Sequence, residues 1–345
     1  MIEQRDLNII FNNPIDWEVF RNKTVLVTGA TGRLGAYIVE AFVKADIDWD
    51  LNMNVIALAR SRDKLTKVFR NELKLPNLIT IVQDITEPIV YEKDVHFIFH
   101  TAGAASPKEF TDDPVGTLWG HLMGTRNVLE FARTHNTEKV LYVSTVETYG
   151  DWKQDSSIKE TDCGVMRADN SRACYPEAKR MCETMFASYE EQYGVNYIGV
   201  RLCHTLGPGI LLDDGRAFAE FINNALNGKD IVLHSDGSKA RTYTYVSDAI
   251  GAILVAFTKG KDKYYNVANI DNLISIKDLA ELIAKLSSKD IRVIVDVKDN
   301  KKLKYLPFKL GIMNVDRICS LGWRPQVGIK ETFKYTMDSF EQGNY

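Results

Sequence analysis

The sequence lacks the features that would place it with nucleic-acid-binding, membrane or secreted proteins. Its formal net charge at pH 7 is −3, so no basic excess favours nucleic acid or an anionic membrane as a partner. The longest uncharged apolar run, residues 249–257, is far too short to cross a bilayer. The start, MIEQRDLNII, does not join a basic stretch to an apolar one, and we therefore expect no signal peptide and a cytoplasmic protein.

Cysteine and histidine are scarce and not grouped. The five cysteines are an odd number without Cys-x-x-Cys spacing, which predicts reduced thiols in the cytoplasm. The six histidines form no ligand-spaced cluster, and we expect no metal site. With 45% hydrophobic and 26% charged residues, the 345-residue chain has the composition of a globular protein with one large or two fused domains.

Strand-like and helical patterns alternate from Lys23 onward. The strand-like runs cover residues 24–28, 53–59, 78–82, 95–100, 139–144 and 195–202, and helical patterns such as residues 113–135 lie between them. This alternation predicts an α/β fold with a Rossmann-type, doubly wound parallel sheet.

The same pattern suggests how the chain is divided. After Gly207 the alternation weakens, and the pieces DIVLHS, KYYNVAN and IRVIVDV suggest a smaller C-terminal α/β cap that binds substrate. We expect residues 1–22 to form an extension with a short helix that covers a sheet edge. Residues 23–207, with parts of 240–270, are expected to form the nucleotide-binding domain, and the cap to lie mostly in residues 208–345. The basic stretch 298–305 predicts a solvated loop.

Three glycines stand between the first strand and the first helix of this pattern, in TVLVTGATGRLGAYIVEAF. Gly29 permits a tight turn, Gly32 lets the backbone approach a pyrophosphate, and Gly35 lets the helix pack closely on the strand. The phosphates then lie at the helix N-terminus, where free N–H groups and the helix dipole favour negative charge. We therefore expect a dinucleotide in contact with the loop and the following strand ends, at Gly29, Thr31, Gly32, Arg33, Leu34, Gly35, Asp84, Ile85, Thr101 and Ala102.

The residue after the second strand bears on which dinucleotide is bound. NAD-binding proteins usually carry an acidic residue there, whereas this chain has Arg60 in IALARS. A guanidinium at this place pairs with a 2′-phosphate. The sequence favours NADP(H) and leaves NAD(H) possible, with a surface arginine that binds no ligand as the alternative for Arg60.

Three further residues form a candidate catalytic group. Thr145 ends the strand LYVST, and Tyr175 and Lys179 follow with the i, i+4 spacing that puts them on one helix face. The ammonium group can lower the tyrosine pKa and hold the nicotinamide ribose. Tyr175 can then exchange a proton with a substrate hydroxyl or carbonyl while hydride passes to or from the cofactor. Thr145 can hydrogen-bond the same oxygen.

These motifs together resemble the extended short-chain dehydrogenases/reductases of the NAD-dependent epimerase/dehydratase family, which act on nucleotide-linked sugars. The resemblance runs from about Lys23 to Trp323 and rests on TGATGRLG, ASPKEF, VSTVETYGD, CYPEAKR, LGPGILLDDGR, ARTYTYVSDA and LGWRP. The segments ASPKEF, CYPEAKR and DDGR are most similar to the UDP-glucuronate decarboxylase branch.

The resemblance implies roles for residues that spacing alone does not assign. It implies that Thr145, Tyr175 and Lys179 are catalytic. It also implies that the nucleotide diphosphate faces Arg216 and Arg241, whose guanidinium groups match phosphate oxygens. A homodimer through helices near residues 114–135 and 173–193, and a role in polysaccharide precursor synthesis, are further implications. Ser106 and His204 are candidate substrate contacts.

Several positions depart from the family pattern. His121 and His204 replace asparagines, and we expect His121 to be a hydrogen-bonded core residue, while His204 is equally compatible with a ligand contact and a structural bond. Sugar 4,6-dehydratases carry an acidic pair where this chain has Val146 and Glu147. Glu147 is thus a candidate base, or a carboxylate that orients its neighbours. Decarboxylases carry an arginine before LGWEP, whereas this chain has FKLGIMN, which disfavours that activity.

We therefore predict an enzyme that acts on a nucleotide-activated sugar or sugar-derived substrate, with an NADPH-dependent ketoreductase as the leading hypothesis. The alternatives are an epimerase that oxidises the sugar transiently, an enzyme of the UDP-glucuronate decarboxylase or 4,6-dehydratase type, and a cofactor-sensing or scaffold protein without turnover.

Overall fold

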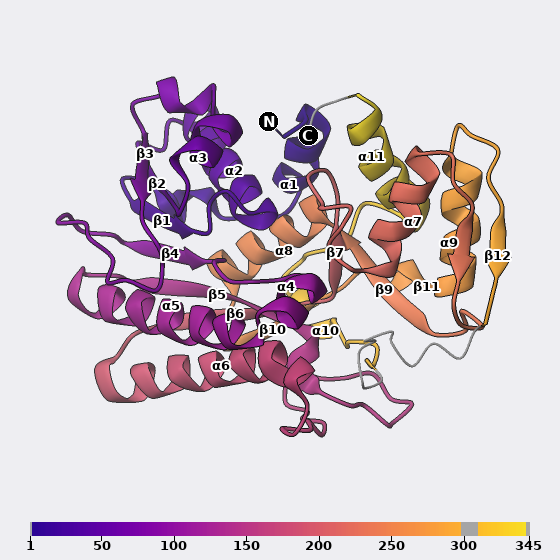
Figure 1. Cartoon of the computed structure of the whole chain (residues 1–345). Coiled ribbons are helices and arrows are strands. Elements are labelled where there is room, and N and C mark those ends of the chain that lie inside the picture. Colours follow the sequence, from indigo (N-terminus) through magenta and orange to yellow (C-terminus); the bar gives the residue numbers. More distant parts are fainter. Residues whose placement is uncertain (1, 298–309, 343–345) are drawn as a thin grey trace.

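The computed structural model describes residues 2–297 and 310–342. Its main feature is a parallel sheet of seven strands in the order β10-β6-β5-β4-β1-β2-β3 (Figure 1). The strands are β1 (Thr24–Thr28), β2 (Asn54–Ala59), β3 (Leu78–Val82), β4 (Phe97–His100), β5 (Lys139–Thr145), β6 (Tyr197–Leu202) and β10 (Tyr264–Val267). The strand order reverses between β1 and β4, which confirms the predicted doubly wound sheet.

Helices cover both faces of this sheet, so its central strands are almost continuously apolar and buried. One face packs against α2 (Arg33–Trp49) and α8 (Val246–Lys259), and the other against α5 (Pro114–Thr134) and α6 (Cys174–Tyr193) (Figure 1). The connection between β2 and β3 contains α3 (Arg62–Val68) and the 3-10 turn η2 (Glu72–Lys74). This layering fixes the carboxyl ends of the strands along one edge.

The C-terminal part forms a smaller α/β lobe, as predicted. Its strands form a sheet in the order β11-β9-β7 and a separate parallel pair, β12-β8. These strands are β7 (His204–Leu206), β8 (Ile231–Leu233), β9 (Ala240–Tyr245), β11 (Leu273–Ser275) and β12 (Val293–Val295). Three helices enclose a second core with them: α7 (Ala217–Leu226), α9 (Ile276–Leu286) and α11 (Ile329–Glu341).

The remaining short elements join the two lobes or prepare the site. They are η3 (Val146–Tyr149), η4 (Ser171–Ala173), η5 (Ile270–Asn272), α4 (Pro107–Asp112) and α10 (Asp316–Ser320). None of the helices within the described ranges is long and apolar enough to cross a bilayer. All five cysteines are free thiols.

Most predicted element boundaries agree with the structure to about two residues. KYYNVAN was grouped with the pieces of the cap, although the main domain was expected to include parts of 240–270, and that grouping is wrong. KYYNVAN contains β10, which pairs with β6 at the edge of the main sheet instead of lying in the cap. The reason is that Tyr265 and Val267 are buried in the core that α8 forms on this sheet. The predicted loop over residues 298–305 lies outside the described residues.

The N-terminal segment packs on helices, whereas the sequence suggested that it covers a sheet edge. It contains α1 (Gln4–Phe11), which contacts α8, and the 3-10 turn η1 (Trp17–Phe20). Asp6 is fully buried and accepts hydrogen bonds from the hydroxyls of Tyr37, at 2.7 Å, and Tyr245, at 2.9 Å. One carboxylate thereby joins the N-terminal segment to α2 and to β9 in the smaller lobe.

Replacing Asp6 by Ala is expected to lower the free energy of unfolding by about 2–4 kcal/mol, because two buried tyrosine hydroxyls lose their acceptor. Urea unfolding of the whole chain measures this. Asp16→Ala is the matched control, since Asp16 is exposed and makes no side-chain capping bond. A loss for Asp6→Ala no larger than that of the control would contradict this account of the N-terminal segment.

Candidate active site

The glycine loop has the backbone geometry of a phosphate-binding turn. Gly29 has φ of +67°, and a Cβ there would lie 2.8 Å from the backbone of Ala102, after β4. A Cβ on Gly35 would lie 2.4 Å from the carbonyl oxygen of Gly29. The helix α2 begins at Arg33, and no side chain caps its N-terminus. Its first N–H groups are thus available to a pyrophosphate, and the loop fits the expected dinucleotide.

The predicted contacts at the other strand ends lie along the same edge. Arg60 is exposed directly after β2, and the charge of Arg60 contributes to the lowered pKa of Asp84, after β3. The main cause of that lowered pKa is the backbone bond from Thr86 to the Asp84 carboxylate. Ile85 is buried, and the Thr101 hydroxyl donates to the carbonyl of Thr28 at 2.7 Å. Asp84 and Thr101 shape the edge, while Arg60 faces solvent.

Arg33 reaches away from the glycine loop to the smaller lobe. Its Nη2 donates to the carbonyl oxygen of Thr205, in β7, at 2.6 Å. Burial, followed by the nearby charge of Arg216, lowers the pKa of Arg33 to about 10. This side chain therefore links the nucleotide-binding loop to the cap.

The structure brings Thr145, Tyr175 and Lys179 together where β5 ends and α6 begins. Thr145 lies near enough to the Tyr175 phenol to lower its pKa. Lys179 donates from Nζ to the carbonyl oxygen of Val143 at 2.8 Å, and burial lowers the pKa of Lys179 to about 8.

The proton affinity of the tyrosine has causes that the sequence did not reveal. Burial and the negative charge of Glu147 raise the pKa of Tyr175 to about 12. The groups that oppose this rise in pKa are Thr145, Arg216 and Arg172. Two arginines thus lower the pKa of the phenol, which is the role that the sequence suggested for Lys179.

Two aromatic side chains hold the Tyr175 ring. The Phe110 ring, from α4, stacks on it at 4.2 Å between centroids and 12° between planes. The ring of His121 lies 5.6 Å away on α5 and hydrogen-bonds through Nε2 to the carbonyl oxygen of Ala104 at 2.9 Å. Burial keeps the pKa of His121 well below its usual value, so this residue is a neutral, hydrogen-bonded core histidine, as expected.

Glu147 is paired with an arginine that sequence reasoning did not single out. Arg172, in η4, donates from Nη2 to both carboxylate oxygens, at 3.1 and 3.0 Å. Burial nevertheless raises the pKa of Glu147. The only signal for Arg172 was its place three residues before Tyr175, and for Phe110 its place in ASPKEF.

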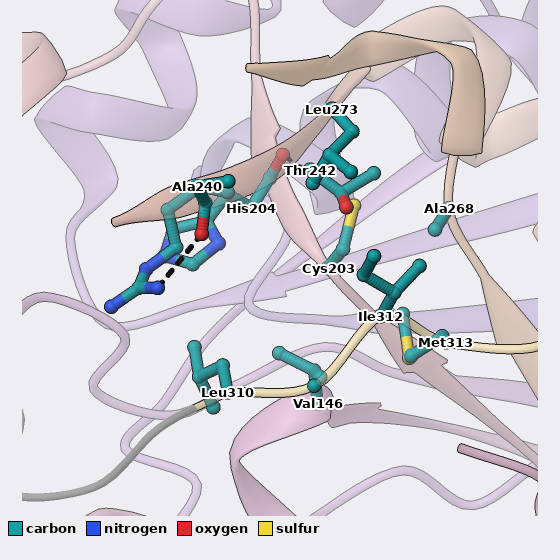
Figure 2. Close-up of a pocket in the computed structure, with 12 residues that line it drawn as sticks. Val146, Cys203, His204, Ala240, Thr242, Ala268, Leu273, Leu310, Ile312 and Met313 are labelled. Atoms are coloured by element: carbon teal, nitrogen blue, oxygen red, sulfur yellow. Dashed lines mark hydrogen bonds between the residues drawn. The ribbon is translucent and has the colours of Figure 1, made fainter. Parts of the chain in front are cut away.

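Two of the four predicted substrate contacts, His204 and Arg241, line a cavity next to Val146, the residue after Thr145. Val146, His204 and Leu310 are among the lining residues labelled in Figure 2. Burial and then the charges of neighbouring arginines lower the pKa of His204 to about 3, so its ring is neutral. Arg241 donates from Nη1 to the carbonyl oxygen of Ala240 at 2.9 Å, and burial lowers its pKa.

Arg216 and Ser106 make protein contacts in this structure. Arg216 donates to the carboxylate of Asp214 at 3.0 Å and to the carbonyl oxygen of Ala105, which connects the two lobes. The Ser106 hydroxyl belongs to a capping box with Glu109 at the start of α4. Substrate contact by either residue stays a prediction.

Replacing Gly29 by Ala is expected to abolish dinucleotide binding, because the methyl group clashes with backbone atoms and the positive φ is strained. Titration of the protein with NADH and NADPH, followed by fluorescence, measures this. Gly120→Ala is the control, since a Cβ at that glycine of α5 meets no atom within 4 Å. Undiminished binding by Gly29→Ala with unchanged thermal stability would contradict the assigned site.

Comparison with known proteins agrees with this geometry. The model of the NAD dependent epimerase/dehydratase family matches residues 25–268. UDP-glucuronic acid decarboxylase 6 of Arabidopsis thaliana is 29% identical over 324 residues, which cover 92% of this chain and 89% of the relative. UDP-glucuronic acid decarboxylase 1 of Xenopus tropicalis is 29% identical over 322 residues, covering 93% of this chain and 72% of that protein.

Solved structures share the fold. A UDP-N-acetylglucosamine 4-epimerase from Methanobrevibacter ruminantium has a TM-score of 0.79 and 21% identity, covering 94% of this chain and 99% of its own. A dTDP-glucose 4,6-dehydratase from Bacillus anthracis, solved in complex with NAD, has a TM-score of 0.76 and 20% identity, covering 93% and 97%. Since the family model matches most of the sequence, the chain belongs to the NAD dependent epimerase/dehydratase family and is an enzyme, as its motifs indicated.

Proposed function

We propose that this enzyme holds a nicotinamide dinucleotide along the carboxyl edge of the main sheet and oxidises a nucleotide-linked sugar at a hydroxyl that faces Tyr175. The observation that carries the proposal is the joint position of Thr145, at the end of β5, and Tyr175, in the first turn of α6, where Thr145 lies near enough to the phenol to lower its pKa. Family membership supports turnover over the cofactor-sensing or scaffold alternative.

Different residues along this edge would hold different parts of the cofactor. The N–H groups that open α2 would hold the pyrophosphate, and Arg60 and Asp84 lie where the adenosine end belongs. Lys179 would hold the nicotinamide ribose. When bound, the nicotinamide supplies hydride exchange with a sugar carbon.

The chain itself handles the proton. Tyr175 takes the proton of the sugar hydroxyl during oxidation and gives it back during reduction, while Thr145 bonds the same oxygen. Burial raises the pKa of the phenol to about 12, whereas the charges of Arg172 and Arg216 lower it and thus favour the phenolate that oxidation requires.

For the overall reaction we propose decarboxylation of the UDP-glucuronate type, because the curated relatives described above are UDP-glucuronic acid decarboxylases along most of this chain. A uronate that is oxidised at C4 becomes a β-keto acid. The electron pair of the bond between C5 and the carboxylate moves into an enolate, CO2 leaves, and C5 takes up one proton. Reduction at C4 then restores the hydroxyl, so no net oxidant is needed.

Tyr175→Phe is expected to lower CO2 release from UDP-glucuronate by about a hundredfold to ten-thousandfold, since the proton acceptor is lost. The assay supplies NAD and follows CO2, and mass spectrometry identifies the nucleotide product. Tyr193→Phe, at the other end of α6, is the control and keeps wild-type activity. A wild-type enzyme that returns an isomer of its substrate without CO2 would favour the epimerase alternative.

A second candidate, an NADPH-dependent ketoreductase, is favoured by the position of Arg60. This guanidinium is exposed at the end of β2, where a 2′-phosphate would lie, and cellular NADP is mostly reduced. The protonated Tyr175 phenol suits a proton donor to a ketone. The description of the family as NAD dependent supports NAD more than NADP.

Arg60→Ala is expected to weaken NADPH binding by about tenfold or more and to leave NADH binding unchanged, if Arg60 pairs with the 2′-phosphate. Dissociation constants for both cofactors measure this. Arg70→Ala, another exposed arginine, serves as the control. Equal affinities for the two cofactors in wild type and Arg60→Ala would show that Arg60 is not the selector.

We also propose a cytoplasmic homodimer built on α5 and α6. These helices pack against each other and leave Val115, Trp119 and Met181 more than half exposed, at 61%, 59% and 53%. Not every apolar residue of α5 is available for this interface, since Leu129 is fully buried in the core of the chain.

A further inference from the structure

Arg172 is a buried cation placed one turn before the catalytic tyrosine. Its residue exposure is 9%, and Asn170 fixes its backbone by accepting from the Arg172 N–H at 2.9 Å. Its guanidinium lies over the Phe110 ring at 4.9 Å, the same ring that stacks on Tyr175. The position of the guanidinium is therefore set by packing as well as by charge.

Only one of the two terminal nitrogens of Arg172 has an acceptor. Nη2 bonds to both oxygens of Glu147, whereas Nη1 is buried and has no hydrogen-bond partner in the described part of the chain. A buried N–H without an acceptor costs about 1–3 kcal/mol, and more when the group is charged. Such a nitrogen in an active site indicates that a ligand supplies the missing acceptor.

The surroundings favour an anionic acceptor. Arg172 and Arg216 both act on the charges of Tyr175 and Glu147, and Arg241 also acts on Glu147. Two carboxylates stand against these three guanidinium groups: Glu147, which Arg172 holds, and Asp214, which accepts from Arg216 at 3.0 Å. His204, beside Arg216 and Arg241, is neutral because its pKa is lowered to about 3.

The place of Arg172 in the chain separates it from the nucleotide end of the site. Arg216 and Arg241 come from the smaller lobe, where the family resemblance places the diphosphate. Arg172 comes from the main lobe beside Tyr175, where the reacting sugar ring must lie. Residues 310–314, the described part of the segment in which decarboxylases carry an arginine, contain none.

We propose that Nη1 of Arg172 binds the carboxylate of a uronate sugar, so that Arg172 lies between the substrate carboxylate and Glu147. The inference rests on the proposed function and names its substrate class. Because two carboxylates would otherwise repel each other, the guanidinium that bridges them is what admits a uronate beside Tyr175. Glu147 then acts as a positioning residue that orients Arg172.

The test compares two ligands that differ in the carboxylate alone. Dissociation constants of UDP-glucuronate and UDP-xylose are measured by calorimetry on NAD-loaded wild type, Arg172→Met and the control Arg167→Met, whose arginine is exposed on the preceding loop. We expect Arg172→Met to weaken UDP-glucuronate at least about tenfold and UDP-xylose less than about threefold. The control leaves both dissociation constants unchanged.

Two further variants keep the test independent of folding. Arg172→Lys retains the charge, but one ammonium group cannot bridge two carboxylates, so the preference for UDP-glucuronate is still lost. Glu147→Gln retains an acceptor for Nη2 and is expected to keep most of the preference. Equal weakening of both ligands by Arg172→Met and Arg172→Lys would overturn the inference.

The outcomes also separate this inference from the proposed function. If the wild-type enzyme decarboxylates UDP-glucuronate and both Arg172 variants still prefer UDP-glucuronate to UDP-xylose, the proposed function stands and the carboxylate subsite is overturned. A wild-type enzyme that binds neither UDP-sugar would overturn both.

Discussion

The close approach of backbone to backbone at Gly29 is the constraint on which the site depends. The Cα of this glycine lies so near Ala102 that no side chain fits between them, and its positive φ turns the chain from β1 into α2. Because β1 and β4 are neighbours at the reversal of strand order, this contact aligns the carboxyl ends of the sheet. The cofactor edge, the end of β5 and the first turn of α6 all take their positions from that alignment.

Charge balance in the cleft is the second organising feature. The main lobe supplies Arg172 and Glu147, and the smaller lobe supplies Arg216, its partner Asp214, and Arg241, so three guanidinium groups face two carboxylates around the Tyr175 phenol. This excess suits a substrate with several negative charges and favours the phenolate. The hydrogen bonds from Arg33 to Thr205 and from Arg216 to Ala105 cross between the lobes, so arginines near the site also join the two lobes.

The parts of the fold that could be predicted from the sequence are those in which the local backbone geometry permits few residue types. The glycine spacing, the apolar parallel strands and the i, i+4 pair of Tyr175 and Lys179 each follow from local geometry. The partners of side chains could not be predicted, because contacts between Glu147 and Arg172 or between Phe110 and Tyr175 join segments that are distant in sequence. KYYNVAN was placed in the wrong lobe since a four-residue strand carries no signal of the sheet that it joins.

The central claim is that this chain removes hydride from a sugar carbon with Tyr175 as the proton acceptor. The most direct measurement uses UDP-glucuronate that carries deuterium at C4, incubated with the enzyme and NAD and quenched during turnover, followed by mass spectrometry of the released nucleotides. The account predicts that, with wild type, the cofactor caught in its reduced form carries deuterium, which otherwise returns to C4 of the product. It predicts no deuterium in the cofactor with Tyr175→Phe. Turnover in which the reduced cofactor contains no deuterium would contradict the account.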